Sequence, residues 1–332
     1  MRESSLRAHT ARIIIGACAA MAIAAAAWRL DYVRPGVHAA PTAVASAATA
    51  HAAASAPAVP VSPAAVRLLP ERILEGTLFS VIVEGGDPGV KSVAGRFAGE
   101  SLHFRGEDTG VLVAMAAAPL DSAGSRRLEL EISYIDGSRD DRTIEVTVVA
   151  GEYRMERLSV APQFGQPQPP ELQRRIVAEA ARARAVSTGS HETQRMWELP
   201  MIPPRDSRIT SGFGHGRMFN GQVQSRHTGT DFAGAVGAPV RAPARGIVAL
   251  VDDFLLGGGV IYIDHGAGLV TGYLHLSGKN VVEGDTVAAG QIIGRVGATG
   301  RVTGPHLHWI VRYGGHTVDG MSLLGYPSPS GR

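Results

Sequence analysis

Short apolar runs separated by turn residues dominate the chain between residues 66 and 152. In the clearest run, residues 128–135, apolar and polar side chains alternate, which predicts a strand with one buried and one solvent-facing side. Further strands are predicted at 79–83, 102–104, 111–115 and 144–149. Turn sequences such as Gly85-Gly86-Asp87-Pro88 divide the runs at a spacing typical of a small sandwich. We therefore expect an Ig-like β-sandwich domain over residues 66–155.

A second all-β region begins near Ile209, where glycine-centred turns become frequent and helical periodicity is lost. Its strands are predicted at Val240, 246–251, 260–263, 269–274, 292–293 and 306–311. Between the two regions, Pro170 followed by apolar residues at helical spacing predicts a helix over residues 170–185. The expected fold class is thus mainly β, with a C-terminal all-β domain over 206–326. The helix lies in a linker, residues 156–205, and should brace one domain against the other.

The first 34 residues have the pattern of a signal peptide or a membrane anchor. Arg2, Arg7 and Arg12 precede an uncharged apolar run from Ile13 to Trp28. This apolar run of 16 residues is long for the core of a signal peptide, and it is shorter than a membrane-spanning helix, which needs about 20 residues. Cleavage and retention as an inner-membrane anchor therefore both stay open. Residues 35–65, rich in Ala and Pro, are expected to be a flexible linker, which places the remaining chain in the periplasm or cell envelope.

Composition excludes several classes of function. The 332 residues allow about two domains. The single cysteine, Cys18, excludes a disulfide framework and cysteine-based zinc sites. The formal net charge is only +2, and Lys91 and Lys279 are the only lysines, so the chain lacks the concentrated positive field of a nucleic-acid-binding protein. We expect a monomer that does not bind nucleic acid.

Histidine is the residue type that points to chemistry, because seven of the 12 histidines fall between residues 215 and 316. His227 and Asp231 are four residues apart around Gly229, in a stretch that favours an extended chain and so puts both on one face. His306 and His308 share a face of a predicted strand. Nitrogen and oxygen donors from two distant segments suit Zn²⁺, which at catalytic sites takes three protein ligands and water. One histidine of the pair His306 and His308 would then be a metal ligand. The other one, together with His275, would be placed for proton transfer.

Ordered motifs continue through the whole C-terminal third of the chain. They are Ile209-Thr210-Ser211-Gly212-Phe213-Gly214, His227-Thr228-Gly229-Thr230-Asp231-Phe232, Gly237-Ala238-Pro239-Val240, Gly246-Ile247-Val248, Ile263-Asp264-His265-Gly266, Tyr273-Leu274-His275-Leu276-Ser277, Gly284-Asp285, Gly290-Gln291-Ile292-Ile293-Gly294, and Gly297-Ala298-Thr299-Gly300 through Gly304-Pro305-His306-Leu307-His308. In this combination, residues 208–318 resemble the lysostaphin-type (LytM-like) zinc metallopeptidases, a family of murein endopeptidases.

The resemblance implies roles for five residues. His227, Asp231 and His308 would be the ligands of one Zn²⁺ per chain, and His275 and His306 would be catalytic histidines. The division of proton-transfer roles between His275 and His306 stays open. Some members of the family use a tyrosine before the first ligand to hold the oxyanion, but residues 213–226 contain none, so the oxyanion partner is also open. His215, His265 and His316 are expected in turns and loops, outside the site.

The function implied is that of an exported zinc metalloendopeptidase that hydrolyses the peptide cross-links of bacterial peptidoglycan with zinc-activated water. Its partners would be peptidoglycan peptides. Two alternatives stay open: a non-catalytic, cell-wall-binding activator of a murein amidase, and a wall-binding module with an inert zinc. The bond that is cut also stays open between D-Ala–diaminopimelate cross-links and glycine bridges.

Overall fold

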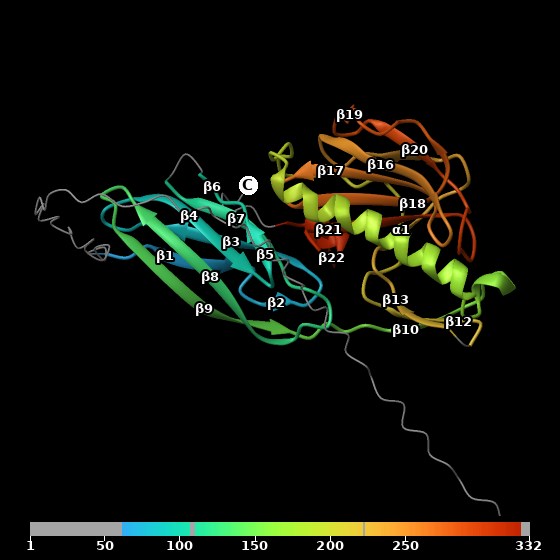
Figure 1. Cartoon of the computed structure of the whole chain (residues 1–332), viewed down its shortest axis with the longest axis horizontal. Coiled ribbons are helices and arrows are strands. Elements are labelled where there is room, and N and C mark those ends of the chain that lie inside the picture. The colour runs from blue at the N-terminus through green and yellow to red at the C-terminus, as the bar shows by residue number, and fades with distance from the viewer. Residues whose placement is uncertain (1–61, 107–109, 222, 327–332) are drawn as a thin grey trace, which may run out of the picture. The chain divides into compact units, whose positions relative to one another are not determined.

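The computed structural model describes residues 62–106, 110–221 and 223–326 (Figure 1). The predicted leader, residues 1–34, and the predicted linker up to residue 61 lie outside these residues. In the part of the chain that is described, no helix combines the length and the apolar character needed to cross a bilayer.

Two antiparallel-rich sheets form the N-terminal part of the described chain. The first has the strand order β1-β3-β7-β6, and its strands are β1 (Ala65–Leu69), β3 (Leu78–Glu84), β7 (Leu112–Ala117) and β6 (Arg105–Gly106). The second has the order β2-β9-β8-β4-β5, with β2 (Ile73–Leu74), β9 (Arg139–Val149), β8 (Gly124–Tyr134), β4 (Val90–Phe97) and β5 (Glu100–Leu102). The two sheets share one apolar core that includes Phe79, Phe97 and Tyr134.

The alternation predicted for residues 128–135 is confirmed in β8, where Leu128, Leu130 and Ile132 are buried and the residues between them are not. Strand β4 was not predicted. Its residues are mostly half-buried or exposed, with only Phe97 fully buried, and Gly95 interrupts the apolar pattern. A Cβ at Gly95 would lie 2.7 Å from Leu130 Cδ2, so this glycine permits close packing on β8 at the expense of a recognisable strand sequence.

The C-terminal part is built on one large sheet. Its main path runs β11-β14-β21-β18-β17-β16-β19, with strands β11 (Ile209–Ser211), β14 (Thr230–Ala233), β21 (His306–Tyr313), β18 (Leu269–Lys279), β17 (Gly258–Gly266), β16 (Gly246–Phe254) and β19 (Thr286–Val287). Off this path, β15 (Pro239–Arg241) pairs with β20 (Ile292–Val296), β20 also pairs with β18, and β22 (His316–Val318) pairs with β21. The prediction of a mainly β chain is confirmed.

An apolar core lies against this sheet and is centred on large side chains such as Trp309, Tyr273 and Tyr313, each at most 1% exposed. Every residue of β17 is buried. This explains why residues 260–263 at its centre are all apolar and do not alternate with polar residues. A short helix, α2 (Gly320–Leu324), follows β22 and is capped by the Asp319 side chain.

The predicted helix is present as α1 (Pro170–Gly189), four residues longer than expected. Ala183 on this helix packs in an apolar cluster with Leu250, Phe254, Val260, Tyr262 and Val270 of the C-terminal sheet. The helix therefore covers that sheet. A contact with the N-terminal sheets comes instead from the following 3-10 turn, η2 (Ser190–Glu192), where His191 Nε2 lies 2.9 Å from Glu100 Oε2. Another 3-10 turn, η1 (Pro162–Phe164), precedes α1.

A third, small sheet was not predicted. Strand β10 (Met155–Leu158) pairs in parallel with β12 (Gly216–Phe219), which forms a hairpin with β13 (Val223–Arg226). β10 lies in sequence before α1, whereas β12 and β13 follow it. The segment predicted as a linker thus adds a strand to the C-terminal fold.

Candidate metal centre

Asp231 and His308 come together because their strands are neighbours in the large sheet. β14 and β21 pair antiparallel, with Asp231 directly opposite His308 and Ala233 opposite His306. Directly opposed residues of such a pair have Cβ atoms about 5 Å apart on the same face. The shared face of His306 and His308 that the sequence predicted therefore also carries Asp231.

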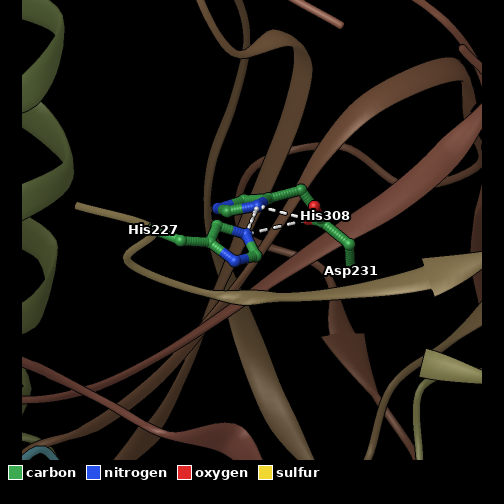
Figure 2. A group of neighbouring side chains, drawn as sticks. All are labelled: His227, Asp231 and His308. Atoms are coloured by element: carbon green, nitrogen blue, oxygen red, sulfur yellow. Dashed lines mark hydrogen bonds and ion pairs between the residues drawn. The ribbon is translucent and has the colours of Figure 1, made fainter. Parts of the chain in front are cut away.

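His227 joins them from the segment between β13 and β14, which bends at Gly229. Its Nε2 lies 3.0 Å from Asp231 Oδ1 and 3.0 Å from His308 Nδ1, and His308 Nδ1 lies 2.8 Å from the same carboxylate oxygen. Figure 2 shows the two rings and the carboxylate converging on one point. All three side chains are buried.

The protonation of His227 indicates that a cation belongs at this point. Its Nδ1 lies 2.6 Å from the backbone oxygen of Gly212, which can only accept, so Nδ1 carries the proton and Nε2 presents a lone pair. That lone pair faces a carboxylate oxygen, and two acceptors at 3.0 Å repel each other unless a proton or a metal ion lies between them. Donor atoms about 2 Å from one tetrahedral metal lie roughly 3.3 Å apart, close to the separations found here. The donor set and its geometry fit a metal ion such as Zn²⁺.

Burial and mutual charge keep these groups in the protonation states that a metal requires. Burial opposes ionisation of Asp231, but the neighbouring imidazoles of His227 and His308 hold the pKa of its carboxyl well below the ordinary value. Burial lowers the pKa of His308 to about 4, against the opposing pull of Asp231. The carboxylate is therefore ionised and the imidazole neutral at neutral pH, as metal ligands must be.

His275 and His306 lie beside the three-residue cluster. Their ring centroids are 4.9 Å apart, and the His275 ring is 5.8 Å from that of His308. His275 donates from Nδ1 to Thr299 O over 2.9 Å, and His306 from Nδ1 to Gly304 O over 2.8 Å. Both rings are thereby held in the tautomer whose Nε2 is free to accept a proton. Burial lowers the pKa of His275 to about 3, so it is neutral at neutral pH.

His275 lies in β18 just beyond the predicted strand, residues 269–274, and its backbone is not that of a regular strand. Its φ is +64°, in the left-handed region that non-glycine residues rarely adopt, and its N–H bonds to Gly257 O outside the ladder. Pairing of β18 with β17 shifts register around this residue. A bulge of this kind turns a side chain away from the alternation of the strand.

Two residues of the site were not identified from the sequence. Arg217 on β12 donates from Nη2 to Asp231 Oδ2 over 2.6 Å and from Nε to Glu156 Oε2 over 3.1 Å. Glu156 on β10 also accepts from Ser211 Oγ and pairs with His215 Nδ1 at 3.0 Å. Neither residue belongs to a motif of metal ligands. Only the pairing of β10 with β12 brings them to the site, and no local sequence signal indicates it.

The other histidines of this region serve structural contacts. His265, expected in a hairpin, is fully buried at the end of β17 and contacts Arg245 O and Thr271 Oγ1. His316 was expected in a loop but lies in β22, with Nε2 2.9 Å from Ala98 O. His215 was expected outside the site. Through Glu156 it belongs to the network that reaches Arg217.

Two hollows adjoin the five residues. One cavity of about 420 Å³ is lined in part by Asp231, His275 and His306, and another of about 160 Å³ is lined in part by His227, His275 and His308. The two share the lining residues Arg217, Phe219, His275 and Arg301 and are therefore neighbours. An extended peptide bound at the cluster would find space in both.

Residues 225–320, which contain all five residues of the site, match the family model described as peptidase family M23. The chain contains an M23 peptidase domain. Among curated proteins, the M23 domain is 41% identical over 104 residues to the peptidoglycan DD-endopeptidase ShyC of Vibrio cholerae, a match that covers 31% of this chain and 24% of ShyC. It is 40% identical over 123 residues to the DD-carboxypeptidase/endopeptidase Mpg of Neisseria meningitidis, covering 37% of this chain and 28% of Mpg.

The similarity to a solved structure extends beyond the M23 domain. A crystal structure of a putative peptidase M23 from Pseudomonas aeruginosa matches 76% of this chain and 96% of its own, with 27% identity and a TM-score of 0.57. The chain spans about a quarter of the length of the curated relatives named above. The similarity to those relatives therefore concerns the M23 domain and its site.

Proposed function

We propose that this protein is an exported zinc metalloendopeptidase that hydrolyses peptide cross-links of bacterial peptidoglycan. The observation that carries the proposal is the lone pair of His227 Nε2 aimed at the ionised carboxylate of Asp231, with His308 completing a three-donor set. Zinc is the metal whose ligand preferences this set meets best. ShyC, which is named as a peptidoglycan DD-endopeptidase, supports the substrate class.

The proposed roles follow from the tautomers at the site. His227, Asp231 and His308 would hold one Zn²⁺, which when bound lowers the pKa of a water molecule and polarises the peptide carbonyl. His275 and His306 each present a free Nε2 beside this position. One of them would take the proton of the attacking water and deliver it to the leaving amine. The other would take up a proton from bulk water, donate a hydrogen bond to the oxyanion, and return the proton to solvent when the product leaves.

Export is part of the proposal because the substrate lies outside the cytoplasm. It is supported by the basic and apolar pattern of residues 1–34. We further propose that the protein acts as a monomer in the periplasm or cell envelope, since the five residues of the site all come from one chain.

The experiment that tests the proposal is the release of peptides from purified diaminopimelate-type sacculi, followed by mass spectrometry. The zinc-loaded protein should release cross-link fragments, whereas His227→Ala, Asp231→Asn and chelator-treated protein should release none. His316→Gln, a histidine substitution outside the site, is the matched control and should keep activity. Undiminished release by His227→Ala or Asp231→Asn would contradict the proposal. If the native protein released no peptides, and the His227→Ala and Asp231→Asn variants stimulated a purified murein amidase, the result would favour an activator.

A further inference from the structure

The two cavities beside the site differ from the metal centre in charge. Among the described residues, their lining includes two acidic side chains, Glu156 and Asp231, and both already accept hydrogen bonds from Arg217. The basic side chains of the lining are Arg208, Arg217, Arg226 and Arg301. The walls therefore carry more positive than negative charge, and a divalent ion would add to this excess.

Two arginines of this lining, Arg208 and Arg301, have no paired anion among the described residues, and only Arg301 is partly buried, since Arg208 is exposed. The guanidinium carbon of Arg301 lies 4.1 Å from the centre of the Phe219 ring, which fixes the side chain by stacking. Among the described residues no carboxylate or carbonyl pairs with that guanidinium. Arg217 and Arg226 differ in this respect, because each is paired with an aspartate, Asp231 and Asp121 respectively.

Partial burial and the neighbouring guanidinium of Arg217 both destabilise the charged form of Arg301. The side chain is half-buried, and burial lowers its pKa, with the nearby charge of Arg217 acting in the same direction. A guanidinium that is partly removed from water and lies near a second guanidinium is stabilised by an anion between or beside them. Arg301 also lines both cavities, so such an anion would lie close to any peptide that crosses the site.

We propose that Arg301 binds a free carboxylate of the substrate peptide near the scissile bond and so selects carboxylate-bearing cross-links over glycine bridges. The inference rests on the proposed hydrolase function. In a D-Ala–diaminopimelate cross-link, the carbon that bears the scissile nitrogen also bears a carboxylate, whereas a glycine bridge offers none. The planar fork of arginine matches a carboxylate with two parallel hydrogen bonds. Arg208, exposed on the wall of the larger cavity, adds to the positive field that attracts such a peptide.

The test compares two cross-linked muropeptide dimers that differ in one group, the free carboxylate of that diaminopimelate or its carboxamide. The measured quantity is the ratio of kcat/KM for the free form to kcat/KM for the amidated form. The native enzyme should favour the free form by about tenfold to a hundredfold, the range expected for a hydrogen-bonded charge. Arg301→Gln should bring the ratio close to one, chiefly by slowing cleavage of the free form. Arg301→Lys should keep part of the preference.

Arg174→Gln removes the same charge from an exposed position on α1 and should leave the ratio unchanged. Because the ratio is taken within one protein, a general loss of folded enzyme cancels, and thermal unfolding of each variant checks this. Equal ratios in the native and Arg301→Gln enzymes would overturn the inference. The proposed hydrolase function would not be affected by that result. An equal slowing of both substrates by Arg301→Gln would also overturn it and point to an oxyanion or structural role.

A binding measurement separates this inference from the proposed function. Calorimetric titration of the zinc-loaded His306→Ala protein with the same two dimers measures recognition without turnover. A preference for the free carboxylate that Arg301→Gln removes would support the inference even if the native enzyme cleaved neither dimer. Equal affinities for the two dimers would overturn it.

Discussion

Arg217 donates from Nη2 to Oδ2 of Asp231 over 2.6 Å and leaves Oδ1 to face His227 and His308. The arginine thus fixes the orientation of the carboxylate at the candidate metal centre. It is itself held by Glu156 and lies mostly out of solvent. Partners that orient metal ligands in this way contribute to metal affinity although they do not touch the ion.

Substitution of Arg217 should therefore weaken zinc binding. Arg217→Gln is expected to raise the zinc dissociation constant by about 10- to 100-fold, because Asp231 loses its fixed orientation and a charged partner. Competition with a chromophoric chelator measures this constant. Arg174→Gln serves as the control for the loss of one positive charge. An unchanged dissociation constant would mean that Arg217 does not position Asp231.

Loss of His275 or His306 should separate metal binding from catalysis. His275→Ala and His306→Ala should each lower kcat/KM on muropeptide dimers by about 10²- to 10⁴-fold, the usual contribution of a general acid or base. Zinc content should remain near one per chain, since neither residue belongs to the three-donor set. Metal analysis of the purified variants measures the content. Loss of zinc from either variant would assign that histidine to the metal.

Zinc should stabilise the fold through the three donors. At a free zinc concentration 100 times the dissociation constant, the free energy of unfolding should rise by about 2.7 kcal/mol. Thermal unfolding with and without zinc measures the change. Asp231→Asn should show a much smaller zinc-dependent shift, whatever its own stability. A full shift in that variant would show that zinc binds elsewhere.

Gly229 should be indispensable for the position of His308. A Cβ at this residue would lie 2.7 Å from His308 Nε2 and 2.5 Å from the backbone oxygen of Trp309. Gly229→Ala should therefore displace the His227 segment, with a loss of stability of about 1–3 kcal/mol and weaker zinc binding. Gly189→Ala is the matched control, because nothing lies within 4 Å of the added Cβ. Unfolding in denaturant and chelator competition give the two quantities.

His265 should make the fold sensitive to acid. Burial lowers its pKa to about 4, whereas an exposed histidine in the unfolded chain titrates near 6.5. The unfolded chain therefore binds the proton first as pH falls, and stability present above about pH 6.5 is lost down to about pH 4. The full effect is about 3 kcal/mol.

His265→Gln keeps an amide donor for Arg245 O and an acceptor for Thr271 Oγ1 but does not titrate. Its free energy of unfolding should depend less on pH between 6.5 and 4 than that of the native protein. Parallel denaturant titrations at several pH values measure the difference. Identical pH profiles would show that another group controls acid stability.

The candidate site could be predicted from sequence where its geometry is local. The alternation of a strand places His306 and His308 on one face. His227 and Asp231 do meet, but the chain between them bends at Gly229 and does not stay extended as the sequence predicts. The absence of a side chain at Gly229 also gives the His308 ring room.

Features that depend on pairing between distant segments could not be predicted in this way. Nothing in the sequence around Glu156 indicates that β10 pairs with β12 and brings this carboxylate to Arg217. The bulge at His275 lies in the part of β18 beyond the predicted strand, and no residue around it indicates a positive φ. Both features arise from tertiary packing, which overrides local pattern.

Strand β10 has a consequence for anyone who divides this protein into parts. A fragment that begins where the M23 match begins, at residue 225, would omit both Arg217 and Glu156, and one that begins near Ile209 would omit Glu156. A fragment that keeps this pair has to start upstream of Met155. In a chimera with a different N-terminal domain, the junction would likewise have to lie before Met155. Helix α1 follows β10 in the chain and is therefore retained in such a chimera.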